Sequence, residues 1–244
     1  MTPLNRGNGE GWGNAFALRS VRGMSLVETV IVLAVGAILV SLSSAAVSSI
    51  SGRTKNVRCL SRLRTLGTGV VLYSRDNNGD FPRSLHSAAG AGKTPWGKAI
   101  LPYIGLAADP PDSEWERVFN VYYRCPADKN TSSNLWSYAL NVYFELTPDG
   151  DDYEGSPATW RKVVNVDRPG ATILMAEPKS VFYADHIMCH QWTSAKGATN
   201  AIDRLRHGGS SNYLFVDGHA EALSIGATYD PGNGMNRWNP ALAK

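Results

Sequence analysis

The sequence predicts an α+β fold, in which a long N-terminal helix packs on a C-terminal domain built around an antiparallel β-sheet. Three observations support this prediction. The run from Leu26 to Val47 is mostly apolar and carries one charge, Glu28, and about 20 such residues suffice for a helix to cross a bilayer. Apolar residues then recur at helical spacing as far as Tyr73. The last third of the chain alternates short strand-like runs with turn residues.

Length and charge limit the classes of protein to consider. The chain has 244 residues, enough for one domain besides a membrane helix. Its hydrophobic content of 43% and charged content of 18% are typical of a chain that folds. The formal net charge is +3, of which residues 1–23 contribute +2, leaving +3 − 2 = +1 for the remainder. A chain so close to neutrality lacks the basic footprint of nucleic-acid binding, so no nucleic-acid partner is expected.

Residues 1–23 are interpreted as a cytoplasmic leader segment. They are rich in glycine and asparagine and lack an apolar core, which argues against a Sec-type signal peptide. Residues 24–50 then form the membrane-spanning half of the long helix. The positive-inside rule alone favours the opposite orientation, because five basic residues follow the apolar run against three in the leader. These five are Arg53, Lys55, Arg58, Arg62 and Arg64.

Residues 51–77 are expected to continue the helix as an amphipathic half. One apolar stripe runs along it, made of Val57, Leu60, Leu63, Leu66 or Gly67, Val70 and Tyr73. Gly52, Gly67 and Gly69 weaken this half, each by up to about 1 kcal/mol relative to alanine. Gly79 and Pro82 end the helix, which is predicted to run from Met24 to about Arg75.

Residues 78–244 are expected to form the globular domain. A short helix is predicted from Trp96 to Ile104, and a short strand entering a turn within Tyr122–Asp128. The aromatic segment from Asn134 to Glu145 is interpreted as core, although such residues can also stack nucleic-acid bases. Asp217-Gly218 predicts a two-residue type I′ hairpin. The candidate strands are Ala171–Ala176, Val181–Tyr183, Tyr213–Val216 and His219–Leu223.

The segment from Gly23 to Glu28 resembles the processing site of type IV prepilins and type II secretion pseudopilins. The resemblance implies a pilin-like fold, cleavage after Gly23 by a prepilin peptidase, and N-methylation of Met24, where the family usually has phenylalanine. It also implies that Glu28, at the fifth mature position, pairs with the N-terminal amine of a neighbouring subunit, which would satisfy a carboxylate that is costly in lipid. An ordinary signal anchor with a stray acid is the alternative.

A second resemblance covers the C-terminal hairpin. His207, nine residues, and then Asp217-Gly218 resemble the H-x(9)-D-G signature of prepilin-like proteins labelled as processing-associated. Cys59 and Cys125 fall on further marks shared with that family, whereas Cys189 does not. The resemblance therefore implies a Cys59–Cys125 disulfide, which a compartment outside the inner membrane permits. Three buried free thiols are the alternative.

The same region holds residues of types that bind metals. His207, Asp217 and His219 form one group of candidate ligands. A second group consists of Asp185, His186, Cys189 and His190. Neither group has three or four ligands at a spacing known for metal sites, so no metal and no cofactor is predicted. The chain also lacks a nucleophile elbow, a P-loop and a Rossmann glycine pattern, so no enzyme activity is predicted.

Two classes of function follow. The favoured one is a pilin-like or pseudopilin-like structural subunit of a type II secretion or type IV pilus-type envelope assembly. It would be a single-pass inner-membrane protein with its C-terminal domain in the periplasm, and its partners would be a prepilin peptidase, other pilin-like subunits and membrane lipid. The alternative is a membrane-anchored periplasmic binding or metal-binding domain that uses the leader for delivery only.

Overall fold

The computed structural model describes residues 23–130, 135–147, 150–151, 160–179 and 184–244, and the side chains of all of these except 42–49 and 146–151. Most of the predicted leader and the candidate strand Val181–Tyr183 lie outside the described residues. The chain divides into two compact units, Met1–Val47 and Ser48–Lys244.

Helix α1 (Leu26–Asp76) begins in the first unit. Its start is a capping box: Ser25 Oγ accepts a hydrogen bond from Glu28 N at 3.2 Å, and Glu28 Oε2 accepts one from Ser25 N at 2.8 Å. Among the residues that the structure describes, no helix is both long enough and apolar enough to cross a membrane.

Helix α1 ends in the second unit at the turn that the sequence predicts. Asn78 and Gly79 adopt positive φ angles of 58° and 82°. Gly79 N donates to Ser74 O at 2.8 Å, which satisfies one of the last helical carbonyls. The predicted helix from Met24 to about Arg75 is thus within two residues of the observed one at each end.

The remaining helices of the second unit are short. The α-helices are α2 (Leu85–Gly90), α3 (Trp96–Ala99), α4 (Asp112–Val118) and α5 (Ala195–Ala201). The other helical turns are η1 (Leu101–Ile104), η2 (Phe119–Tyr123), η3 (Val142–Glu145), η4 (Val163–Asn165), η5 (Cys189–Gln191), η6 (Ile225–Ala227) and η7 (Pro231–Asn233).

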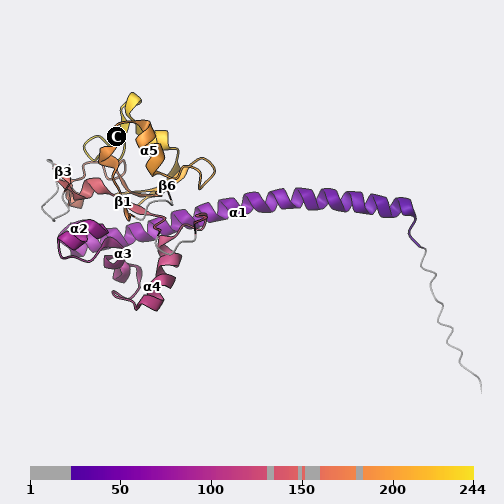
Figure 1. Ribbon diagram of the computed structural model, residues 1–244, viewed down its shortest axis with the longest axis horizontal. Coiled ribbons are helices and arrows are strands. Elements are labelled where there is room, and N and C mark those ends of the chain that lie inside the picture. Colours follow the sequence, from indigo (N-terminus) through magenta and orange to yellow (C-terminus); the bar gives the residue numbers. More distant parts are fainter. Residues whose placement is uncertain (1–22, 131–134, 148–149, 152–159, 180–183) are drawn as a thin grey trace, which may run out of the picture. The chain divides into compact units, whose positions relative to one another are not determined.

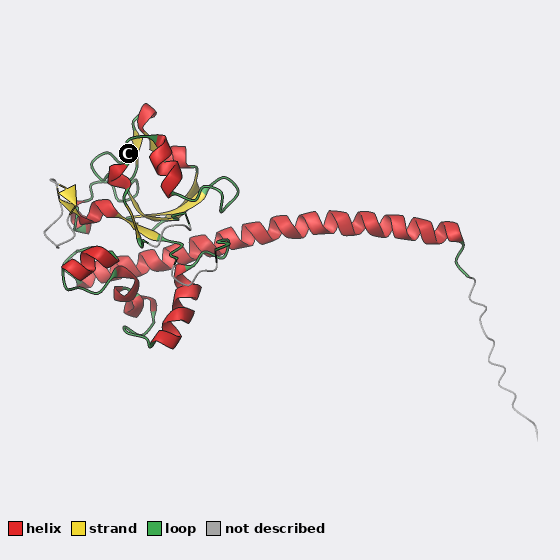
Figure 2. Cartoon of the chain, in the orientation of Figure 1, coloured by secondary structure: helices red, strands yellow, loops and turns green. Residues whose placement is uncertain are grey.

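One five-stranded sheet organises the second unit (Figure 2), in the order β5-β1-β4-β6-β7. Its strands are β1 (Ala139–Asn141), β4 (Ile173–Ala176), β5 (His186–Ile187), β6 (Ser211–Phe215) and β7 (Ala220–Leu223). All neighbouring pairs are antiparallel except β1 and β5, which run parallel and depart from the predicted all-antiparallel sheet. Two small hairpins pair β2 (Leu146–Thr147) with β3 (Gly150–Asp151) and β8 (Tyr229–Asp230) with β9 (Met235–Asn236).

The second half of α1 lies between this sheet and the segment that carries α3 and α4 (Figure 1). The predicted stripe is buried at Leu63, Leu66 and Val70, whereas Val57 is 65% exposed and does not belong to it. Two of the glycines expected to weaken the helix allow it to approach its neighbours closely. A Cβ at Gly67 would lie 2.7 Å from Leu214 Cδ1, and one at Gly69 would lie 2.9 Å from Ile104 Cγ2.

The segment after α4 is a π-helical turn, η2, so the strand predicted within Tyr122–Asp128 is wrong. Trp115, Phe119 and Tyr123 recur every four residues, which is helical spacing. Their rings pack on one another, and Phe119 and Tyr123 also contact the indole of Trp136, at centroid distances of 4.8 and 5.2 Å. Aromatic packing therefore overrides the local preference for a strand.

The C-terminal hairpin forms as predicted, but its loop differs. Leu214 pairs with Ala220, and Phe215 N donates to His219 O, so that three residues make the connection. Gly218 has a φ of 90°, while Asp217 has no positive φ, which a type I′ turn would require. Asp217 Oδ1 instead accepts from His219 N at 3.0 Å and shapes a longer loop ending in a left-handed glycine.

Candidate functional site

Four side chains able to bind a metal converge in the second unit. Cys59, Cys125, Glu177 and His207 each offer one ligand atom, and these atoms all lie within 4.8 Å of one another. We call this group the tetrad. Cys59 belongs to α1, Cys125 follows η2, Glu177 follows β4, and His207 lies in the loop before β6. Four separate segments of the fold therefore meet at this point.

Glu177 is the hub of the tetrad. Its Oε1 accepts a hydrogen bond from Cys59 Sγ at 2.9 Å and lies 3.0 Å from His207 Nε2. His207 Nε2 also lies 3.4 Å from Cys125 Sγ. The second carboxylate oxygen, Oε2, accepts from Asn212 N at 2.8 Å, which fixes the side chain on the first residues of β6.

The side chains of the tetrad are buried. Cys59 and Glu177 have no exposed surface, Cys125 is 3% exposed, and the His207 side chain is 1% exposed. A buried carboxylate of this kind is costly unless cations and hydrogen-bond donors surround it. Here the environment supplies both, so Glu177 is held in place rather than left unpaired.

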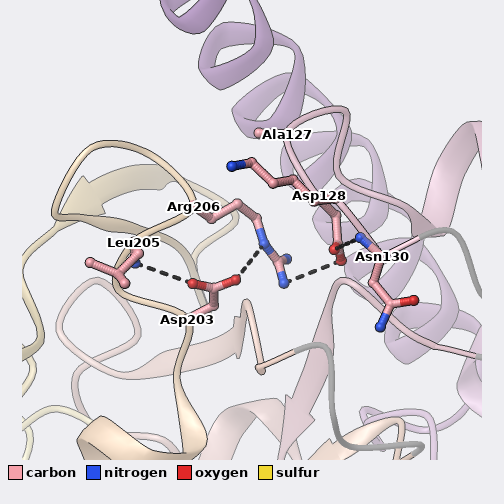
Figure 3. Close-up of a pocket in the computed structure, with 7 residues that line it drawn as sticks. Ala127, Asp128, Asn130, Asp203, Leu205 and Arg206 are labelled. Carbon is pink, nitrogen blue, oxygen red and sulfur yellow. Dashed lines mark hydrogen bonds and ion pairs between the residues drawn. The ribbon is translucent and has the colours of Figure 1, made fainter.

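Arg206 supplies the compensating charge beside the tetrad. Its Nη1 lies 3.7 Å from Glu177 Oε1, its Nη2 lies 3.2 Å from Asp128 Oδ2, and its Nε lies 3.0 Å from Asp203 Oδ2. Figure 3 shows the guanidinium between Asp128 and Asp203. Asp128, Asp203 and Arg206 help to line a pocket of about 310 Å³, and a second pocket of about 670 Å³ is lined by Arg206 and His207 among others.

These contacts shift the pKa values of the four side chains of the tetrad. Burial acts to raise the pKa of Glu177, but hydrogen bonding from His207 and the charge of Arg206 outweigh it and lower the pKa. Burial acts to lower the pKa of His207, yet its contacts with Cys125 and Glu177 raise the pKa to about 9. The hydrogen bond from Cys59 lowers the pKa of Cys125, while burial raises the pKa of Cys59.

The two cysteines of the predicted disulfide do meet in space, since their sulfur atoms lie within 4.8 Å. Both are free thiols in the structure, so the disulfide stays a prediction. Cys189 lies elsewhere, with Sγ donating to Asn141 Oδ1 at 3.0 Å.

The predicted metal candidates separate into two places. His207 belongs to the tetrad, whereas Asp217 and His219 lie at the hairpin loop beyond the far end of β6 and are each 43% exposed. Asp217 Oδ1 lies 2.6 Å from His219 Nδ1, and the His219 ring stacks on Phe215. The signature residues His207, Asp217 and Gly218 thus bracket β6 and do not form one site.

The second predicted ligand group also has a structural explanation. Asp185 Oδ1 lies 3.1 Å from His186 Nδ1, and Asp185 Oδ2 accepts from Leu85 N at 2.9 Å. Among the described residues these side chains do not join Cys189 in a cluster suited to a metal.

Glu177, the hub of the tetrad, was missed by sequence reasoning. The available signal was an acid placed directly after the buried strand β4.

At the thresholds applied, the chain matches no protein-family model, no curated protein and no solved structure.

Proposed function

We propose that this chain is a pilin-like or pseudopilin-like subunit of an envelope assembly of the type II secretion or type IV pilus kind. In this proposal a prepilin peptidase cleaves after Gly23 and methylates Met24, and the apolar half of α1 anchors the subunit in the inner membrane. The C-terminal domain then lies in the periplasm, and the apolar half of α1 later packs against other subunits.

The observation that carries the proposal is where α1 starts. The helix begins at Leu26, and its N-cap, Ser25, is one residue after Met24. Cleavage after Gly23 would therefore leave a mature chain that is helical almost from its first residue. A helix that starts at the N-terminus can be inserted lengthwise into lipid or between other helices without a preceding loop to accommodate.

The side chains of the first half of α1 support the same proposal. Apolar residues lie exposed on every side of this half, including Leu26, Ile31, Val35 and Leu39, with exposed fractions of 49–82%. A helix that is apolar all round is stable in lipid or inside an assembly of helices. Glu28 is the one charge in this part and is the residue that the family resemblance assigns to subunit pairing.

A second candidate function is a membrane-anchored periplasmic domain that binds a metal and uses the leader for delivery only. The buried tetrad favours it, because four ligand types converge there. The two candidates share the processing step and differ in whether α1 builds an assembly.

The N-terminal peptide of the protein isolated from its native membranes tests the shared step by mass spectrometry. We expect a peptide that starts at N-methyl-Met24. A Gly23→Leu variant should retain residues 1–23, whereas a Gly36→Ala variant, with open space around the new methyl group, should be processed normally. Recovery of residues 1–23 on the native protein would contradict both candidates.

A further inference from the structure

The tetrad has the ligand composition of a zinc site. It offers two sulfur atoms, one imidazole nitrogen and one carboxylate oxygen. Thiolate and imidazole ligands suit zinc, whereas calcium and magnesium prefer oxygen ligands throughout. Four protein ligands without an open position are typical of structural zinc sites, in which the metal stabilises the fold.

The distances within the tetrad are close to those that zinc imposes. Tetrahedral zinc binds sulfur at about 2.3 Å and nitrogen or oxygen at about 2.0–2.2 Å, which places its ligand atoms about 3.3–3.8 Å apart. Three pairs of ligand atoms in the structure are separated by 2.9, 3.0 and 3.4 Å, and all four atoms lie within 4.8 Å of one another. They are held together by hydrogen bonds whose protons the metal would replace, so small rotations of the side chains would suffice.

The charges around the tetrad also fit a divalent cation. Two thiolates and the Glu177 carboxylate would bring three negative charges against the two positive charges of the ion. Arg206, 3.7 Å from Glu177 Oε1, offsets the remaining negative charge. Tyr138 adds an outer contact, since its hydroxyl lies 3.0 Å from Cys59 Sγ. Such second-layer hydrogen bonds orient metal ligands and raise their affinity.

We propose that Cys59, Cys125, Glu177 and His207 together bind one Zn²⁺ ion. The ion would join α1 to the end of β4 and to the loop before β6, and so fix the long helix to the sheet. This proposal goes beyond the proposed function, because it assigns a bound metal to the globular domain whether or not α1 builds an assembly.

A disulfide between Cys59 and Cys125 is the competing state of the same residues. It would use two of the four groups and would remove the thiol proton that Cys59 donates to Glu177 Oε1. Zinc would engage all four groups at once. The geometry therefore favours the metal, and the two states differ in thiol content and metal content.

The first experiment measures zinc in the full chain purified in detergent without a chelator, by inductively coupled plasma mass spectrometry. We expect about one zinc ion per chain for the wild type and for Cys189→Ser, whose thiol lies outside the tetrad. The Cys59→Ser and His207→Gln variants should lose most of the metal. Unchanged zinc in both variants would overturn the proposal.

The second experiment uses the wild type alone, so that it does not depend on the folding of a variant. The reduced full chain is stripped of metal and titrated with Co²⁺, and a thiolate-to-cobalt charge-transfer absorption should grow to a one-to-one end point that Zn²⁺ then abolishes. Thiols are counted in parallel without reductant. A Cys59–Cys125 disulfide in the native protein, or three free thiols without zinc or the cobalt absorption, would overturn the proposal.

Discussion

The glycines of α1 differ in whether a side chain at their position would have room. Gly67 and Gly69 face the domain, and a methyl group on either would overlap a neighbouring side chain. Gly52 has no atom within 4 Å of the position that a Cβ would take. The helix-weakening effect that the sequence predicts for all three is therefore offset by close packing at Gly67 and Gly69, and is uncompensated at Gly52.

This contrast gives a paired prediction. Gly52→Ala should raise the free energy of unfolding by about 0.5–1 kcal/mol, because alanine favours the helix and meets no neighbour. Gly69→Ala should lower it by about 1–2 kcal/mol, because its methyl group would lie 3.2 Å from Ile100 Cβ and the cost of overpacking exceeds the gain in helix propensity. Urea unfolding of the two variants beside the wild type measures both values, and equal effects would contradict the assignment.

Some residues of the candidate site could be predicted from the sequence, and others could not. The predicted disulfide singled out Cys59 and Cys125, and these two residues do meet in space. Glu177 was not singled out, because its contact with Cys59 spans 118 residues of sequence, and its one local signal, an acid directly after a buried strand, does not indicate its partners. Conversely, Asp217 and His219 are near His207 in sequence, but the length of β6 separates them from it.

At the scale of elements, the first turn of α1 combines a structural and a functional requirement on one side chain. Glu28 closes the capping box with Ser25, which satisfies a backbone N–H at the start of the helix. The proposed function asks the same carboxylate to carry a negative charge to a neighbouring subunit. Glutamine can meet the first requirement but not the second, so the two can be separated.

The corresponding variants are Glu28→Ala and Glu28→Gln. Alanine removes the hydrogen bond from Ser25 N to the carboxylate and leaves the one from the backbone N–H of residue 28 to Ser25 Oγ, and it should abolish filament assembly in the native host. Glutamine preserves the cap and should also abolish assembly, while protein level and N-terminal processing stay unchanged. Filaments are scored by electron microscopy of sheared cells. Assembly by Glu28→Gln at the wild-type level would show that the charge is dispensable, whereas a wild type that forms no filaments would favour the delivery-only function.

Elements with strong local signals were the predictable part of the fold. The long helix and the C-terminal hairpin depend on periodicity and on Asp217-Gly218, both of which act over a few residues. The parallel pairing of β1 with β5 and the π-helical turn η2 depend on contacts between distant segments, such as Phe119 with Trp136. Tertiary packing decided those elements, so local patterns did not predict them.

For the whole molecule, all of the buried hydrophobic core found among the described residues lies in the second unit, from Cys59 onward. We therefore expect residues 48–244, produced alone, to fold and remain soluble without detergent. Near-ultraviolet circular dichroism should match that of the full chain, because the buried rings of Trp96, Tyr123 and Tyr138 keep their surroundings. A fragment without a near-ultraviolet signal or a cooperative unfolding transition would contradict this expectation.

The packing of α1 against β6 and β7 also has a consequence for the order of events during synthesis. Arg64 donates to Ala220 O, and Asn212 donates to Asn56, contacts that each span 156 residues. The helix is made first and its partner strands last, and contacts so distant in sequence form slowly. The apolar side chains of Leu63, Leu66 and Val70 therefore stay exposed until β6 and β7 have been synthesised. We expect a chaperone that binds apolar helices to bind the nascent chain during this time.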